Sequence, residues 1–124
     1  MSRGVRGATT CTANDEKQMI RTTKVLVEEM IDKNSIDPTD VSHVFISVTK
    51  DLTATFPAKA LREIPGWTYV PVMCMAEIDV DNSLPACIRI MMVVNTDKPQ
   101  HEIKHIFHNE AIKLRPDLIK GELR

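Results

Sequence analysis

Cys-Ile-Arg-Ile-Met-Met-Val-Val, residues 87–94, is the longest nearly unbroken apolar run in the chain. Runs of this composition are typical of a β-strand that is covered on both faces. Arg89 interrupts the run, and its guanidinium stays charged at any pH at which the fold survives. Removing that charge from water is costly unless fixed acceptors or an anionic ligand surround it. Three interpretations stay open: Arg89 reaches solvent at a strand end or edge, forms a structural ion pair, or points into an anion-binding pocket.

Length, charge and cysteine count narrow the class of protein. A chain of 124 residues predicts one domain over residues 1–124. The net charge of −1 provides no long-range field for nucleic acid or an anionic membrane. Three cysteines without a C-x-x-C pair indicate free thiols in a reducing compartment. The N-terminus is too polar for a signal peptide, and no apolar run approaches ~20 residues, so we expect a soluble cytoplasmic protein.

Apolar periodicity predicts an α+β fold, a mixed sheet with helices packed on one face. The expected strands span residues 3–11, 43–49, 67–74, 87–95 and 111–114. Because Pro71 interrupts the third of these, that strand should be an edge or irregular strand. The second face of the 87–95 strand is also apolar, so we expect it to meet other subunits.

Three helices are expected between these strands. Asn14 should cap the first helix, which ends near Lys33, and Pro57 suits the first turn of a short second helix. Asp97 should cap the last helix, whose inward-facing residues would be Ile103, Ile106 and Phe107. Residues 116–124 are expected to form a flexible C-terminal tail.

His101, Glu102 and His105 match H-E-x-x-H, a zinc-binding and general-base motif. On the expected helix, the histidines fall away from the buried face, and the only nearby third ligand would be Glu110. We therefore interpret them as surface histidines. Nucleophilic catalysis has weak support, because Cys74 and Cys87 lie in apolar strands where cysteine is usually inert.

The strongest remaining indication of a functional site is a set of cationic residues in or near apolar elements. Arg6 and Arg89 lie in expected strands, and one acidic residue, Glu77, follows the third strand. Further cations are Lys59, Arg62 and Arg115. If they converge, these side chains would bind a small polyanion, since arginine recognises carboxylates in a bidentate manner. With no obvious general base besides Glu77, the set favours binding, or a reaction driven by electrostatics.

Six blocks of sequence closely resemble the trimeric α/β chorismate mutases, the non-helical class. The blocks are Arg6–Thr10, Phe56–Ala60, Gly66–Val72, Cys74–Val80, Cys87–Met92 and Leu114–Leu118. The resemblance runs from about Arg3 to Leu118. It implies a pseudo-barrel-like homotrimer with the second sheet face toward the trimer core and an active site between adjacent subunits. It also implies rearrangement of chorismate to prephenate without a cofactor, metal or covalent intermediate.

The resemblance also implies roles for individual residues. Arg89 would donate to the ether oxygen of the breaking bond, and Glu77 would accept from the substrate ring hydroxyl, with Cys74 beside it. Arg6 would bind a substrate carboxylate. The apolar wall would be Phe56, Ala58, Val72 and Leu114, and Met73 would contribute mainly backbone. The mouth of the site would carry Lys59, Arg62 and Arg115.

Two positions depart from the family pattern. The family usually has tyrosine where Phe107 stands, so this chain lacks a hydroxyl that helps bind a carboxylate, and we expect weaker substrate binding more than lost chemistry. Position 73 is commonly threonine; Met73 should have little effect because its backbone is the implicated part. Alternatives to a mutase are a trimeric imine or enamine deaminase and a non-catalytic module that binds a small anion.

Overall fold

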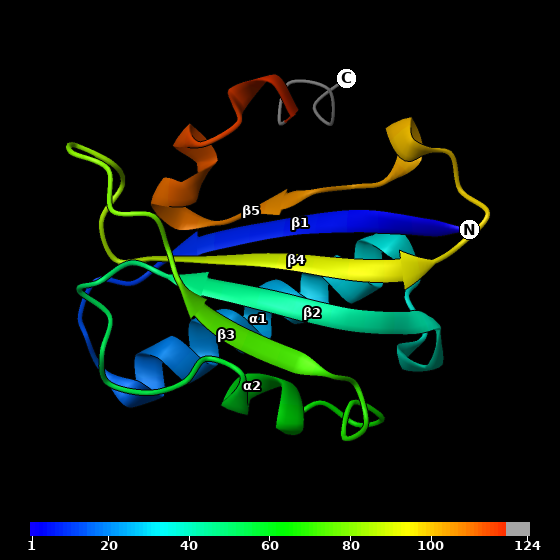
Figure 1. Cartoon of the computed structure of the whole chain (residues 1–124), viewed down its shortest axis with the longest axis horizontal. Coiled ribbons are helices and arrows are strands. Elements are labelled where there is room, and N and C mark those ends of the chain that lie inside the picture. Colours follow the sequence, from blue (N-terminus) through cyan, green and yellow to red (C-terminus); the bar gives the residue numbers. More distant parts are fainter. Residues whose placement is uncertain (119–124) are drawn as a thin grey trace.

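The computed structural model describes residues 1–118, and five strands in that part of the chain form one sheet (Figure 1). The strands are β1 (Ser2–Thr10), β2 (Val41–Val48), β3 (Val72–Ala76), β4 (Cys87–Asn95) and β5 (Ile106–Phe107). Their order across the sheet is β3-β2-β4-β1-β5. β4 is antiparallel to its neighbours β1 and β2, whereas β3 and β5 pair in parallel with β2 and β1. The expected mixed sheet is confirmed, and the apolar stretch at 87–94 lies within its central strand.

Helix α1 (Glu16–Asn34) packs on one face of this sheet, behind the strands in Figure 1. Its cap is Asp15, whose carboxylate accepts from the Gln18 N–H at 2.9 Å. The predicted cap, Asn14, was wrong by one residue: the Asn14 side chain instead bonds the backbone of Thr53 and Ala54. A carboxylate at the N-terminus of the helix also complements the helix dipole.

Close packing of α1 on β1 depends on Gly7. A Cβ atom at this position would collide with the sulfur of Met30, which is fully buried in α1. A side chain at position 7 would force Met30 to move, so glycine permits this close packing of strand and helix. The buried face of α1 comprises Met19, Thr23, Leu26, Val27, Met30 and Asn34.

The second helix and third strand are shorter than expected. Helix α2 (Lys59–Arg62) has four residues, and Pro57 precedes it instead of lying in its first turn. The expected strand at 67–74 begins only at Val72, because Trp67 is followed by turns and Pro71 has no N–H to donate to a ladder. Trp67 is nevertheless buried in the core. As predicted from Pro71, β3 is an edge strand of the sheet.

The C-terminal third contradicts the prediction of a last helix. Residues expected to be helical form a single 3-10 turn, η2 (Gln100–Glu102), followed by extended chain. Ile106 and Phe107 pair in parallel with Gly7 and Ala8 as strand β5. The strand predicted at 111–114 is also wrong, because those residues lie at the end of a second 3-10 turn.

That turn is η3 (Asn109–Lys113), and the end of β1 fixes its start. The Asn109 side chain donates to Thr9 Oγ1 at 3.1 Å and to the Thr10 carbonyl at 3.3 Å, and Glu110 N donates to Thr10 Oγ1. Residues 116–118 form a helical turn. The expected flexible tail otherwise falls at 119–124, outside the described residues.

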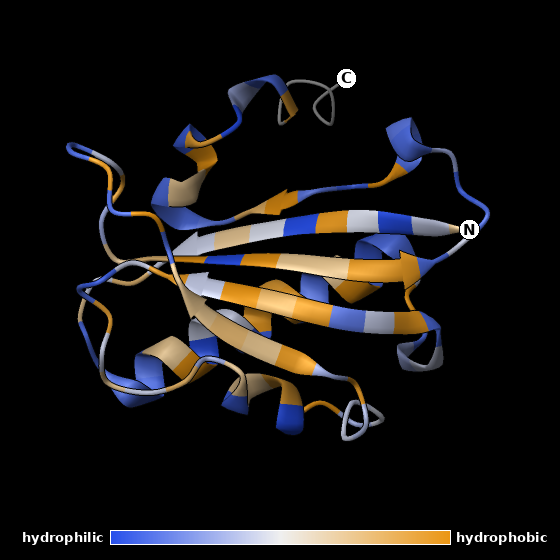
Figure 2. Cartoon of the chain, in the orientation of Figure 1, coloured by the Kyte–Doolittle hydropathy of each residue, from blue (hydrophilic) through white to orange (hydrophobic). Residues whose placement is uncertain are grey.

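The opposite face of the sheet is open in the single chain. Ile88, Ile90, Met92 and Val94 of β4 are buried in the main core. Their neighbours alternate to the other face, where Met91 is 38% exposed. Cross-strand pairing places Phe45 beside both Met91 and Met73, so large apolar side chains adjoin one another on this face. Figure 2 shows that apolar residues predominate along much of β4 and recur along β2.

No helix within residues 1–118 combines the length and the hydropathy that crossing a membrane requires.

Candidate active site

Arg89 lies on the open face of the central strand, and its side chain is 50% exposed. It is therefore neither at a sheet edge nor at the end of its strand. Its Nη1 lies 3.5 Å from Oε2 of Glu77. This is long for a charge-assisted hydrogen bond, so the ion pair leaves most of the donor capacity of the guanidinium free for another acceptor.

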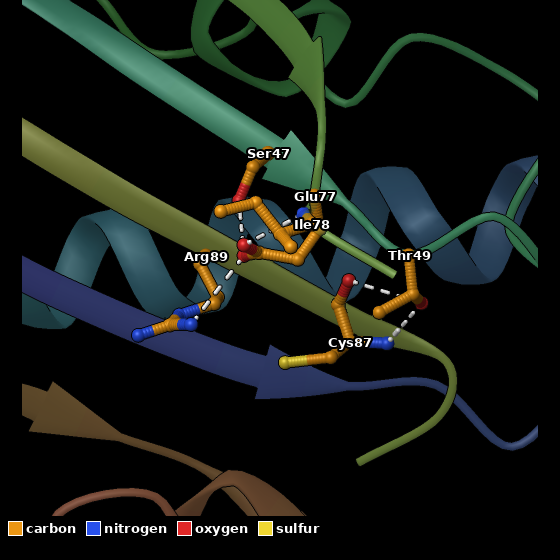
Figure 3. A network of polar contacts seen from close by, with 6 residues as sticks. All are labelled: Ser47, Thr49, Glu77, Ile78, Cys87 and Arg89. Carbon is orange, nitrogen blue, oxygen red and sulfur yellow. Dashed lines mark hydrogen bonds and ion pairs between the residues drawn. The ribbon is translucent and has the colours of Figure 1, made fainter. Parts of the chain in front are cut away.

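Glu77 is held more firmly than Arg89. Its Oε2 accepts from the Ser47 hydroxyl at 2.8 Å, and its Oε1 accepts from its neighbour Ile78 N at 3.1 Å. Figure 3 shows the carboxylate between Ser47 and Arg89. Glu77 N also donates to the Val48 carbonyl at 2.9 Å, which fixes the chain just after β3. The carboxylate is thus positioned by β2 and faces the cation of β4.

The register of the sheet explains how these side chains meet. Arg89 is opposite Ser47 on β2 and opposite Ala8 on β1, and Ala8 is opposite Phe107 on β5. Opposite residues in a sheet point to the same face. Phe107, Arg89 and Ser47 therefore lie in one row across the sheet, with Ala8 giving room for the guanidinium.

A concavity of about 440 Å³ opens over this row. Five of the predicted site residues line it: Arg6, Glu77, Arg89, Phe107 and Arg115. The structure thereby brings three arginines and one carboxylate to one open cavity. Residues on the same lining that the sequence interpretation missed include Phe45, Ser47, Met75, Ile78 and Met91. Alternation along β4 was the available signal for Met91, which lies two residues from Arg89. No site residue was predicted on β2, so there was no such signal for Phe45 and Ser47.

Three other predicted residues line a different concavity. A second concavity, of about 590 Å³, is lined by Phe56, Lys59 and Cys74 together with the loop before α2. Cys74 lies one residue out of phase with Met73 and Met75, so its side chain points to the other face of the edge strand. Within one chain, Cys74 and Glu77 therefore line different concavities, although Met75 and Ala76 border both.

Five predicted residues line neither concavity: Ala58, Arg62, Val72, Met73 and Leu114. Val72 is half-buried on the same side of β3 as Cys74, whereas Met73 is 62% exposed on the open face. The Ala58 backbone hydrogen-bonds the Cys74 thiol, and Arg62 is exposed on α2. Leu114 is half-buried after η3, beside Arg115. The guanidinium of Arg115 is bound by the Asp117 carboxylate, at 3.1 and 2.9 Å.

The cysteines are poorly suited to act as nucleophiles. Burial raises the pKa of the Cys74 thiol, and it raises the pKa of the Cys87 thiol to about 11. At neutral pH both thiols are then protonated, and the thiol is the unreactive form. All three cysteines are free.

The H-E-x-x-H sequence does not form the helix that the zinc motif requires. His101 lies within the 3-10 turn η2 and His105 in the extended segment that follows it, so the i, i+4 geometry of an α-helix is lost. The expectation of surface histidines holds for the exposed His101 but is wrong for His105, which is half-buried. In residues 1–118 no three His, Cys, Asp or Glu side chains gather closely enough to hold a metal ion.

Fold and site together define a small α+β protein with an open cavity, lined by three arginines and a glutamate, over its central strand. The chain belongs to the chorismate mutase type I family, whose model matches residues 2–118. It is 50% identical over 118 residues to chorismate mutase AroH of Bacillus subtilis, covering 95% of this chain and 93% of that protein. It is 40% identical over 119 residues to chorismate mutase AroH of Thermus thermophilus, covering 95% and 97%.

A solved relative has the same fold. The structure of a chorismate mutase from Clostridium thermocellum matches with a TM-score of 0.84 at 47% identity, over 87% of this chain and 96% of that chain.

Proposed function

We propose that this chain catalyses the rearrangement of chorismate to prephenate. Membership of the chorismate mutase type I family supports the reaction. The observation that carries the mechanism is Arg89, a half-exposed cation on the central strand that Glu77 contacts only at 3.5 Å. Such a cation is available to a substrate oxygen that gains negative charge.

The reaction breaks one C–O ether bond and forms one C–C bond within a single molecule. Six electrons move in a cycle, so no proton, nucleophile or oxidant is needed. Catalysis then consists of holding the compact reactive conformer and stabilising charge separation. Arg89 would donate to the ether oxygen, and such a fixed donor contributes about 3 kcal/mol, by analogy with an oxyanion-hole donor.

Glu77 would accept from the ring hydroxyl of the substrate. Its carboxylate already has fixed donors in the Ser47 hydroxyl and the Ile78 N–H, and it retains free lone pairs for a further donor. Arg6 borders the same cavity, where it would bind a substrate carboxylate. Arg115, whose guanidinium is paired with Asp117, would lie at the mouth of the site. Phe107 lies at the β5 end of the row formed with Arg89 and Ser47, and its apolar ring adds no hydrogen bond.

We also propose that the active site is completed between subunits of a homotrimer. Two observations support a shared site. The predicted residues divide between two concavities on opposite sides of edge strand β3. The open face also exposes large apolar side chains, including Phe45 at 39%, Met73 at 62% and Met75 at 41%. Apolar surface of this kind is typical of subunit interfaces, and a neighbour's Phe56, Lys59 and Cys74 would cover the Arg89 cavity.

The test is an assay of chorismate loss and prephenate formation by the purified, assembled protein. We expect turnover well above the uncatalysed rearrangement, and an unchanged background rate would contradict the proposal. If chorismate binds without reacting, the chain is a non-catalytic module for small anions. Ammonia released from an imine or enamine substrate, with no prephenate formed, would instead identify a deaminase.

A further inference from the structure

The half-buried imidazole of His105 contacts both ends of Arg6. The backbone N–H of Arg6 donates to His105 Nδ1 at 2.9 Å, and the Arg6 guanidinium nitrogen Nη1 lies 3.3 Å from Nε2 of the same ring. One histidine thus touches the main chain and the charged tip of the same arginine. This is the second histidine of the H-E-x-x-H sequence, and the proposed reaction does not use it.

The hydrogen bonds of His105 identify its protonation state and its tautomer. A neutral imidazole has one acceptor nitrogen, and the Arg6 N–H occupies it at Nδ1. The ring proton is therefore on Nε2, which meets the guanidinium as a contact in place of a hydrogen bond. Protonating Nδ1 would direct a second N–H at the Arg6 N–H, so the arrangement requires the neutral ring.

The electrostatic surroundings agree with a neutral ring. Burial lowers the pKa of His105 to about 4, with the charges of Arg6 and then Arg115 acting in the same direction. Other charged or titratable side chains around the concavity that His105 borders are Lys33, Lys98, His101, Glu102, Lys104 and Asp117.

The backbone at His105 is anchored on its N-terminal side by Asn34, a buried residue at the end of α1. The Asn34 carboxamide accepts from Lys104 N at 2.8 Å and donates to the Lys104 carbonyl at 2.8 Å. On the other side, Ile106 enters strand β5 and pairs with Gly7 of β1. The ring therefore projects from a segment that is fixed at both ends, which makes it a rigid support.

We infer that His105 is a positioning residue that fixes the backbone of Arg6 and limits the positions of its side chain at the cavity, where Arg6 would bind a carboxylate of the substrate. Arginine side chains have several rotatable bonds, and holding one in place reduces the ordering cost of binding. The bond at Nδ1 fixes the backbone from which the side chain extends. Nε2–H and Nη1 are both donors and do not attract each other, so the ring acts on the guanidinium only by limiting the space it can occupy. This role rests on the proposed function, because it presupposes that Arg6 binds substrate.

The experiment is a double-mutant cycle on chorismate turnover with His105→Leu and Arg6→Ala. We expect His105→Leu to lower kcat/KM about 10-fold, mostly through KM, because a carboxylate contact is shared by ground and transition states. In the Arg6→Ala background the same change should cost no more than about 2-fold, because the residue it positions is already absent. Equal losses in both backgrounds, or full activity of His105→Leu, would overturn the inference.

Two further variants separate positioning from simple structural damage. His105→Asn places an amide oxygen where Nδ1 accepts, so it should keep the bond to the Arg6 N–H and recover part of the lost affinity. His101→Leu, the exposed histidine of the same motif, should leave kinetics unchanged. If His105→Asn is no better than His105→Leu, the Nδ1 bond has no positioning role.

A measurement without substrate distinguishes this inference from the proposed function. Imidazole ¹⁵N chemical shifts of the wild-type protein at neutral pH should identify His105 as the neutral Nε2–H form. A charged ring, or the Nδ1–H form, would overturn the assignment whether or not the protein acts on chorismate. Absence of mutase activity together with the Nε2–H form would refute the proposed function alone.

Discussion

At the scale of single residues, the candidate site pairs a well-anchored carboxylate with an arginine that has few hydrogen-bond partners. Arg89 has only a 3.5 Å contact to Glu77 among residues 1–118, whereas Glu77 has strong donors in Ser47 and Ile78. The anion that would satisfy Arg89 is then the substrate in its transition state. This difference suits electrostatic catalysis. Glu77 would be a fixed acceptor for the substrate hydroxyl, and Arg89 would be a cation with free donors for the developing negative charge.

Phe107→Tyr should strengthen substrate binding. The Phe107 ring borders the Arg89 cavity, and a phenol there would add a donor for a substrate carboxylate. One added hydrogen bond corresponds to a decrease in KM of about 3- to 10-fold, with kcat within about 2-fold of wild type. Steady-state kinetics measure both constants, and a KM that stays the same or rises would show that position 107 does not face a carboxylate.

His105 should make stability depend on pH in mildly acidic solution. Its pKa is about 4 in the folded chain, against an ordinary value of 6.5. Between these values the unfolded chain binds a proton that the folded chain does not, so the free energy of unfolding falls as pH decreases from 6.5 to 4. Below pH 4 this contribution changes no further.

The comparison is urea unfolding of wild type and His105→Asn at pH 7.5 and 4.5, at one protein concentration. We expect the loss of stability on acidification to be smaller in the variant. Equal losses in the two proteins would mean that His105 is not held neutral by the fold.

At the scale of elements, the sequence correctly predicted the strand and the helix that have a clear apolar pattern of their own. The run at 87–94 predicted β4, and the apolar spacing at 19–31 predicted α1. The last helix failed because Ile103, Ile106 and Phe107 fit a helical period, but pairing of Ile106 and Phe107 with β1 overrides that preference. A short apolar run does not itself distinguish a strand from a helix.

The candidate site was predictable only in part for a related reason. Arg89 was identifiable because a charge in an apolar strand needs an explanation. The support that His105 gives to Arg6 was not, because 99 residues separate them and only the fold brings them together. The division of the site into two concavities depends on which face of β3 each residue occupies, and the predicted boundaries of that strand were wrong.

Asn14 should stabilise the loop that carries part of the second concavity. Its Oδ1 accepts from Thr53 N and Ala54 N at 2.9 Å each, and its Nδ2 donates to Thr53 Oγ1 at 2.8 Å. Asn14→Ala removes these bonds and should lower the free energy of unfolding by about 1–2 kcal/mol. Because the loop leads to Phe56, we also expect KM to rise.

Asn14→Asp is the matched control, since it keeps the acceptor oxygen and loses only the donor to Thr53. It should lie between wild type and Asn14→Ala in denaturant unfolding and in KM. If Asn14→Ala has wild-type kinetics and stability, the loop is held by other contacts.

At the scale of the whole molecule, the open sheet face and the divided site make one prediction about assembly. We expect a solution mass three times that of the 14.0 kDa chain. Arg89→Ala and Lys59→Ala alter different concavities, so subunits of the two variants can complement each other. After co-refolding in equal amounts, about a quarter of the sites in a random trimer would have both halves intact.

The measurement is mutase activity of the mixture against each variant alone. Activity above both single variants would support a site between subunits. The matched control mixes Arg89→Ala with Arg6→Ala, which alter the same concavity and should not complement. A monomeric mass, or equal behaviour of the two mixtures, would contradict a shared site.

The most direct test of the central claim is the rate of prephenate formation by Arg89→Ala beside wild type and Arg21→Ala, an exposed arginine of α1. We expect kcat to fall at least about 100-fold in Arg89→Ala, as for loss of one oxyanion-hole donor. Its solution mass should be unchanged, and Arg21→Ala should retain wild-type activity. Wild-type turnover by correctly assembled Arg89→Ala would contradict the assignment of Arg89 as the electrostatic catalyst.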